Sequence, residues 1–225
     1  MNLIIVGIGG IGSHLLLPLL QYLSVKNRFD DVVLVDGDKY ESKNTARQVV
    51  PEVGKNKALA TTLYYQEMFP NLNVIPNLTY INKSNVSQCI NDDDVVLVCV
   101  DNNETRALIE EYAITLDNIT IISGGNELFD GNVIIMQRKN GKPTTSTISE
   151  IHPEIKKSED HPEALSCEAL AQSEPQISIT NASIADVMRR ILFAMMFDGV
   201  KYNEVYINLK NGNIRNVKIE NTLIL

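Results

Sequence analysis

The chain has few cysteines, histidines and aromatic residues: its 225 residues include three cysteines, three histidines and no tryptophan. No C-x-x-C pair occurs, and the histidines are not spaced as a metal-binding set, so we expect no structural zinc. Three cysteines without close pairs do not make a disulfide framework and are typical of a reducing compartment. The sequence therefore predicts a cytoplasmic protein.

Positive charge and long apolar runs are also scarce. The net charge is −8, whereas binding to a phosphate backbone needs a cationic face, so we expect no nucleic-acid partner. The apolar N-terminus, Leu3 to Val6, is too short for a signal peptide or a membrane span, so we expect no membrane contact. A chain of this length can bury a sizeable core as one domain.

Short apolar runs alternate with helical patterns through the first half of the chain. Strands joined by crossover helices lie parallel, so this alternation predicts a Rossmann-like α/β sheet. Pro18 should kink the first helix or lie in its first turns. We expect strands over residues 3–6, 32–35, 74–75, 94–100 and 119–123, and helices over 13–23, 55–69 and 104–115.

The pattern changes after Gly124, where longer strands are expected. Asn211-Gly212 is a strong hairpin signal, so we expect antiparallel strands that extend the sheet in the second half. The polar, proline-bearing stretch 139–166 predicts a mobile surface loop. We expect these later strands over 132–138, 204–210 and 213–219, and an apolar helix over 181–197.

A glycine-rich turn joins the first predicted strand to the first predicted helix. Residues 7–13 read Gly-Ile-Gly-Gly-Ile-Gly-Ser, the G-x-G-x-x-G pattern in the context that nucleotide binding requires. Its glycines let the backbone approach phosphates at a helix N-terminus. Asp36 ends the second strand, about 20 residues further on, where a carboxylate binds ribose hydroxyls. Loop and carboxylate alone do not separate NAD from ATP. The glycines are Gly7, Gly9, Gly10 and Gly12.

The stretch after the second strand is unusually rich in polar residues. A dinucleotide needs no further cations, because helix N–H groups bind its pyrophosphate. A triphosphate carries more charge, and its transfer chemistry calls for Arg and Lys clamps. This set therefore favours ATP: Asp36, Asp38, Asn44, Arg47, Gln48, Lys55 and Lys57.

These motifs, taken in order, resemble the adenylation core of the ThiF/HesA/MoeB superfamily, which is shared with ubiquitin-activating enzymes. The order is the glycine loop, Val35-Asp-Gly-Asp38, Asn44-Thr-Ala-Arg-Gln48, Gly54-Lys-Asn-Lys-Ala58 and Val100-Asp-Asn102. The resemblance covers residues 1–125 and is specific there, whereas the rest matches only in outline. It implies one adenylation domain over 1–225, with a nucleotide-binding core over 1–125 and an antiparallel extension over 126–225.

The resemblance also implies roles for individual residues. Asp36 would hold the ribose, and Asn44, Arg47 and Lys57 would contact the phosphates. Asp101 would help to hold Mg²⁺ or align the attacking carboxylate, while Arg106 would have a structural part. The glycine loop, Asp38, Gln48 and Asn102 would complete the ATP site.

The reaction implied is acyl adenylation. A C-terminal carboxylate, typically that of a ubiquitin-like or sulfur-carrier protein, attacks the α-phosphate of ATP, and pyrophosphate leaves. Relatives commonly work as dimers, so a homodimer is expected. Larger relatives carry an N-terminal helix whose arginine reaches a neighbouring subunit's ATP, and paired zinc-binding cysteines. We expect no such arginine here, since the chain begins almost at its first strand, and no zinc-binding cysteines, since no C-x-x-C pair occurs.

Cys167 is the candidate for a second step in which the acyl group passes to a thiol as a thioester. The alternative is an ordinary loop or helix-cap position, and adenylation does not require the cysteine. Cys89 and Cys99 are interpreted as small core residues. The polar run 172–181 either lines an acyl-acceptor channel or is an ordinary loop.

Two other functions remain open at the level of sequence. An NAD-dependent oxidoreductase would share the glycine loop and Asp36, but it leaves Arg47, Lys57 and Asp101 unexplained. A non-enzymatic nucleotide-binding partner would bind ATP without the thioester step. Stabilisation by NAD⁺ would favour the first, and ATP binding without pyrophosphate exchange would favour the second.

Overall fold

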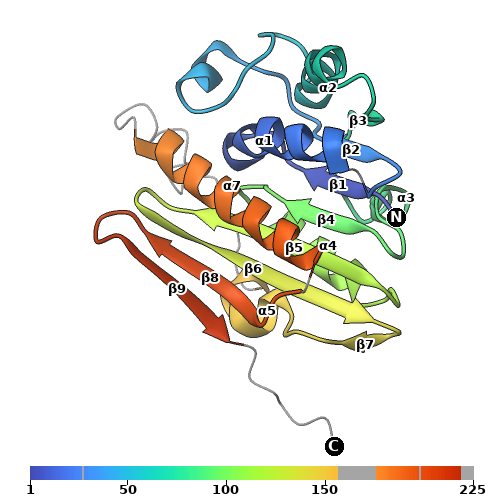
Figure 1. Ribbon diagram of the computed structural model, residues 1–225, viewed down its shortest axis with the longest axis vertical. Helices are drawn as coiled ribbons and strands as arrows, with labels where there is room; N and C mark the ends of the chain where they lie inside the picture. The colour runs from blue at the N-terminus through green and yellow to red at the C-terminus, as the bar shows by residue number, and fades with distance from the viewer. Residues whose placement is uncertain (27, 157–175, 198, 219–225) are drawn as a thin grey trace, which may run out of the picture.

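The computed structural model describes residues 1–26, 28–156, 176–197 and 199–218. Within these residues, nine strands form one mixed sheet in the order β3-β2-β1-β4-β5-β6-β8-β9, with the short β7 paired to β6. Helices cover the sheet on both faces (Figure 1). The Rossmann-like α/β class predicted from the sequence is confirmed, as is the antiparallel extension.

The first half of the sheet is parallel. Its neighbouring strands pair in register, as with Leu3 beside Val32 and Val95. Alternate side chains of β1 point into two different core clusters. Leu3 and Ile5 belong to one cluster, and Ile4 and Val6 belong to the other, so the strand is buried on both faces. The strands are β1 (Leu3–Val6), β2 (Val32–Val35), β3 (Val74–Asn77), β4 (Val95–Val98) and β5 (Ile119–Asn126).

Two layers of helices cover this sheet. One core cluster joins it to α1 (Gly10–Lys26), α2 (Lys57–Met68) and α7 (Gln176–Met195). The other joins it to α3 (Val86–Cys89), α4 (Asn103–Ala113) and α5 (Ile148–Ile151). In Figure 1, α1 and α7 lie side by side across one face. Helix α1 begins three residues before the predicted start and continues through Pro18.

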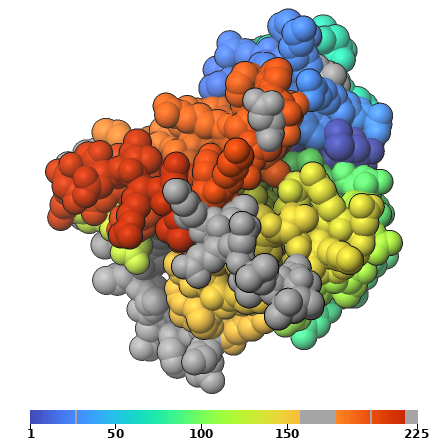
Figure 2. Space-filling model, turned by 60° about the horizontal axis from the view of Figure 1, so that its bottom comes forward, coloured from blue at the N-terminus to red at the C-terminus, as the bar shows by residue number. Residues whose placement is uncertain are grey.

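The second half of the sheet is antiparallel. It is built by β6 (Asp130–Lys139), β8 (Tyr202–Asn208) and β9 (Asn213–Lys218), with Gly212 at φ +70° in the hairpin that the sequence predicted. On the surface, β8 and β9 (red) lie apart from the N-terminal residues (blue) in Figure 2. The extension therefore forms one flank of the molecule.

The stretch 139–166 differs from the predicted loop. Up to residue 156 it contains β7 (Lys142–Pro143), α5 and the 3-10 helix η2 (Pro153–Lys156), and Ile148 is buried. The carboxylate of Glu110, on α4, accepts hydrogen bonds from the backbone N–H and the hydroxyl of Ser149. Residues 139–156 therefore contain short regular elements where the sequence predicted only a loop, and the Ser149–Glu110 bonds and the burial of Ile148 place α5 against α4. Residues 157–166 lie outside the described part of the chain.

The C-terminal helix also begins earlier than predicted. Helix α7 starts at Gln176, so residues 176–181 of the polar run are helical rather than a loop. Among the described residues, no helix is long and apolar enough to cross a membrane.

Candidate active site

A cavity of about 720 Å³ opens at the carboxyl ends of the parallel strands. Most of the predicted nucleotide-site residues meet there. The lining includes Gly7, Gly9, Gly10, Asp36, Asp38, Arg47, Gln48, Lys57, Asp101 and Asn102. Gly12 and Asn44 are not part of the lining. Ligands of open α/β sheets bind at this edge, which agrees with the predicted location.

The glycine loop has a conformation that other residues would disturb. Gly7 has φ +89°, and a Cβ there would lie 3.0 Å from the carbonyl of Cys99. A Cβ at Gly12 would lie 2.0 Å from the carbonyl oxygen of Gly7, so Gly12 serves the close turn rather than the cavity. Gly9 and Gly10 bring the backbone to the cavity at the first turn of α1. The first N–H groups of a helix have no partner within it, so this turn is suited to an anion.

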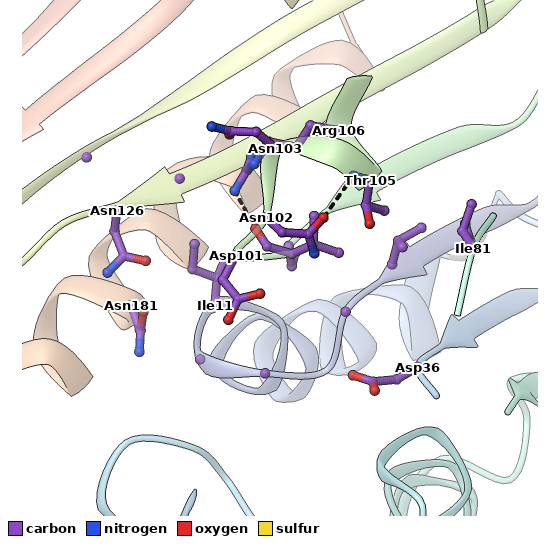
Figure 3. Close-up of a pocket in the computed structure, with 18 of the residues that line it drawn as sticks. Ile11, Asp36, Ile81, Asp101, Asn102, Asn103, Thr105, Arg106, Asn126 and Asn181 are labelled. Carbon is purple, nitrogen blue, oxygen red and sulfur yellow. Dashed lines mark hydrogen bonds between the residues drawn. The ribbon is translucent and has the colours of Figure 1, made fainter. Parts of the chain in front are cut away.

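Asp36 holds the glycine loop to the end of β2. Its Oδ2 accepts a hydrogen bond of 2.6 Å from the backbone N–H of Ile8, and its Oδ1 accepts one of 2.8 Å from that of Asp38. Burial raises the pKa of the Asp36 carboxyl above its usual value, against the opposing effect of these N–H donors. Asp36 therefore shapes the loop as well as facing the cavity (Figure 3).

Lys57 is placed at the cavity by the start of α2. Asn56 caps this helix by accepting from the N–H of Leu59 at 3.1 Å, and it donates 2.8 Å to the carbonyl of Asp36. The Lys57 Nζ lies 3.1 Å from Asp38 Oδ2, and only 10% of its side chain is exposed. Tyr80 also donates to Asp38. A cation thus lines the same cavity as the glycine loop, with a carboxylate as its partner.

Arg47 and Gln48 follow the 3-10 helix η1 (Ser42–Ala46), and both are buried in the cavity wall. The Oε1 of Gln48 has no hydrogen-bond partner within the described ranges. Asn44, for which the resemblance implied a phosphate contact, is buried and is not part of the cavity lining. Its Oδ1 accepts 2.8 Å from the N–H of Glu41 and caps η1, so it supports the segment that carries Arg47.

Asp101 lies after β4 and is exposed in the cavity, between Asp36 and Asn181 in Figure 3. The next residue, Asn102, caps α4 by accepting 2.8 Å from the N–H of Thr105. Arg106 joins two strand ends, since it donates 2.7 Å to the Ser123 hydroxyl and also to the carbonyl of Val100. These bonds agree with the structural part expected for Arg106.

The antiparallel extension contributes a polar cluster that sequence reasoning missed. His152 lies 2.8 Å from Glu204 through Nε2 and 2.8 Å from Glu154 through Nδ1. Asn132 donates 2.6 Å to the same Glu204 carboxylate. Burial lowers the pKa of His152, but the two carboxylates outweigh it, so the pKa lies above its ordinary value. Asn132 and Glu204 come from β6 and β8, whereas His152 follows α5 and Glu154 lies in η2, so no sequence motif joins the cluster.

Two of the three cysteines are buried structural residues. Burial raises the pKa of the Cys99 thiol to about 12 and also raises that of Cys89. Both agree with the prediction of core positions. Cys167 lies outside the described residues.

The cavity suits a nucleoside triphosphate by the chemistry of its groups. It combines a glycine-lined helix N-terminus, the cations Arg47 and Lys57, and carboxylates at two strand ends. Within the described ranges, no group of three or more His, Cys, Asp or Glu residues is placed to hold a metal ion. Asp101 is one of several carboxylates that line the cavity, and it is exposed there.

Comparison with known sequences finds curated relatives that are named as adenylyltransferases or activating enzymes. The adenylyltransferase and sulfurtransferase UBA4 of Meyerozyma guilliermondii is 32% identical over 141 residues, which are 61% of this chain and 32% of that protein. The SAMP-activating enzyme E1 of Haloferax volcanii is 32% identical over 133 residues, 58% of this chain and 47% of that protein. The match thus covers less than half the length of either relative.

Solved structures share the fold across nearly the whole chain. E. coli MccB with ATP aligns over 99% of this chain and 65% of that one, with a TM-score of 0.72 and 17% identity. PaaA aligns over 98% of this chain and 73% of that one, with a TM-score of 0.68 and 18% identity. The ThiF family model matches residues 1–222. Motifs, fold and family model agree, and the chain belongs to the ThiF family.

Proposed function

We propose that this protein binds ATP with Mg²⁺ and uses it to adenylate a C-terminal carboxylate. The observation that carries the proposal is that Lys57, Arg47 and Asp101 line one cavity with the glycines of the first turn of α1, in a ThiF-family chain. A triphosphate and its transfer chemistry call for such cations, whereas the helix N–H groups suffice for the pyrophosphate of a dinucleotide. The adenylyltransferase names of the curated relatives support the same reaction.

Each residue group has a distinct part in this reaction. The first turn of α1 binds phosphate oxygens, while Asp36 fixes the loop and faces the ribose. Lys57 and Arg47 stabilise charge on the transferring and leaving phosphates. Asp101 and the phosphates would hold Mg²⁺, which supplies further charge neutralisation when bound. A carboxylate oxygen bonds to the α-phosphorus, the bond to the pyrophosphate oxygen breaks, and an acyl adenylate and pyrophosphate result.

The acyl substrate proposed is the C-terminus of a ubiquitin-like or sulfur-carrier protein. The names of the relatives support this class, since they include an enzyme that activates SAMP and a sulfurtransferase. We propose that residues 1–225 act as one domain, because the cavity draws its walls from both the core and the extension. A homodimer in the cytoplasm is proposed from the resemblance. Where the reaction has a thiol acceptor, Cys167 is that acceptor, because Cys89 and Cys99 are buried.

The first experiment compares thermal stabilisation of the purified chain by Mg-ATP, Mg-AMPCPP and NAD⁺. A ligand at about 100 times its Kd adds roughly 2.7 kcal/mol of stability, which is readily measured. We expect stabilisation by both ATP compounds and none by NAD⁺. Stabilisation by NAD⁺ alone would overturn the proposal in favour of an oxidoreductase.

A second experiment tests the reaction itself. Exchange of labelled pyrophosphate into ATP is measured with candidate carrier proteins, each with a control carrier whose terminal carboxylate is amidated. We expect exchange only with a free carboxylate, because an amide nitrogen is a poor nucleophile. Exchange that persists with the amidated carrier would show that the carboxylate is not the group activated.

A further inference from the structure

The side chain of Asn181, on α7, is a buried amide at the wall of the cavity. Only 3% of the residue is exposed, and its Nδ2 has no hydrogen-bond partner in the described part of the chain. A buried donor that lacks an acceptor destabilises the folded state, so an acceptor that the ligand brings would remove this cost. The amide therefore marks a contact that the described residues do not supply.

The position of this amide is closely fixed. A Cβ at Gly10 would lie 2.4 Å from the Asn181 Nδ2, so the amide fits against the glycine loop only because residue 10 has no side chain. The preceding residue, Thr180, donates 2.8 Å to the carbonyl of Leu128, which fixes this turn of α7 against the loop after β5. A ligand atom at the first turn of α1 would therefore meet a preset donor.

The donor lies on the side of α1 away from the ribose carboxylate. Figure 3 shows Asp36 on one side of the first turn of α1 and Asn181 on the other, near Asn126, with Asp101 between them. A nucleotide whose ribose faces Asp36 places its phosphates over the turn. A substrate group that approaches the α-phosphate from the side of the turn opposite Asp36 then comes from the side of Asn181.

We propose that Asn181 Nδ2 donates to one oxygen of the substrate carboxylate and so orients the other oxygen toward the α-phosphorus. This inference rests on the proposed adenylation. A neutral amide holds the carboxylate without cancelling its charge, so the free oxygen stays nucleophilic. After attack, the same donor binds the carbonyl oxygen of the acyl adenylate, and no proton moves in the step.

The test compares a stable mimic of the acyl adenylate with its fragment. N-acetylglycyl sulfamoyl adenosine carries the acyl carbonyl, whereas adenosine 5′-sulfamate lacks it. Affinities for both compounds and for Mg-AMPCPP are measured by calorimetry on wild type, Asn181→Ala and Asn181→Asp. Ser183→Ala is the matched control, because among the described residues this half-buried serine of α7 donates only to its own helix, at the carbonyl of Ile179.

We expect Asn181→Ala to weaken binding of the acyl compound about ten-fold or more, as the loss of a hydrogen bond to acyl oxygen implies. Binding of the sulfamate and of Mg-AMPCPP should stay within about two-fold, and Ser183→Ala should match wild type. Asn181→Asp keeps the size of the side chain but not the donor, so it should lose the acyl preference as well. Unliganded melting temperatures verify that the variants are folded.

Two results would overturn the assignment while adenylation stands. If Asn181→Ala weakened binding of Mg-AMPCPP as much as binding of the acyl compound, the amide would contact the phosphates rather than the acyl group. If both Asn181 variants kept the wild-type preference for the acyl compound over the sulfamate, the amide would not contact the acyl oxygen. Failure of wild type to bind Mg-AMPCPP at all is a different result, because it refutes the proposed function itself.

Discussion

The guanidinium of Arg189, on α7, donates a hydrogen bond of 2.9 Å to the carbonyl oxygen of His14, on α1. That carbonyl would normally accept from the residue four positions later, but this residue is Pro18, which has no N–H. Arg189 thus supplies the donor that the proline removes. The two helices that carry the glycine loop and Asn181 are joined at this point, so the bond contributes to the geometry of the site.

A double-mutant cycle tests this compensation. We expect Arg189→Met to lower the free energy of unfolding by about 1–2 kcal/mol, because it leaves the His14 carbonyl without its donor. In a Pro18→Ala background the new N–H at position 18 reaches that carbonyl, so the same substitution should cost less. Urea denaturation measures the coupling. Strictly additive effects would show that the arginine and the proline act independently.

The parallel half of the fold could be predicted from the sequence because its strands are apolar runs. Val32–Val35 and Val95–Val98 are buried between two helical layers, and the glycine loop and Asp36 mark the strand ends. The start of α1 at Gly10 was missed, since glycines are poor helix formers and here serve close contacts.

The second half of the site could not be predicted, because antiparallel register assembles it. Asn132 and Glu204 are neighbours only through the pairing of β6 with β8, and His152 reaches them from a segment that the polar composition marked as a loop. That segment is ordered by Glu110, a charged residue on a helix that sequence alone assigns to solvent. Asn181 lay in a polar run whose role stayed open, and helix α7 places it against Gly10.

Replacement of Lys57 by alanine should weaken binding of Mg-ATP by about ten-fold or more, because a charge-assisted contact to phosphate is lost. Lys55→Ala is the matched control. The Lys55 ammonium is close by in sequence but pairs with Glu52 at 2.7 Å, and its side chain is 44% exposed. Calorimetry measures the affinity of both variants for Mg-AMPCPP. Equal affinities for the two variants would show that Lys57 does not contact the phosphates.

The contribution of His152 to stability should depend on pH. Glu204 and Glu154 raise its pKa in the folded state above the ordinary value, so the protonated form is favoured by folding. This stabilisation is fully present below the unfolded-state pKa of about 6.5 and is lost as pH rises through the folded-state pKa. The free energy of unfolding of wild type minus that of His152→Gln should be roughly 0.5–1 kcal/mol larger at pH 5.5 than at pH 9.

Urea denaturation of both proteins across this pH range measures the difference. Glu154→Gln is a useful companion variant, because it removes the more exposed of the two carboxylates and should narrow the pH effect without abolishing it. A constant difference between wild type and His152→Gln from pH 5.5 to 9 would contradict the prediction.

Cys89 and Cys99 should resist alkylation while the protein is folded. The thiolate is the reactive form, and burial raises the pKa of Cys99 to about 12 and that of Cys89 above its usual value. Iodoacetamide at pH 8, followed by peptide mass spectrometry, should leave both unmodified in the native protein and modify both in urea.

Any thioester formed with a carrier protein should vanish in Cys167→Ser while pyrophosphate exchange persists, because adenylation precedes transfer to the thiol. A thioester that survives in Cys167→Ser would require one of the buried thiols to become exposed during the reaction, and native alkylation in the presence of Mg-ATP and carrier would detect it.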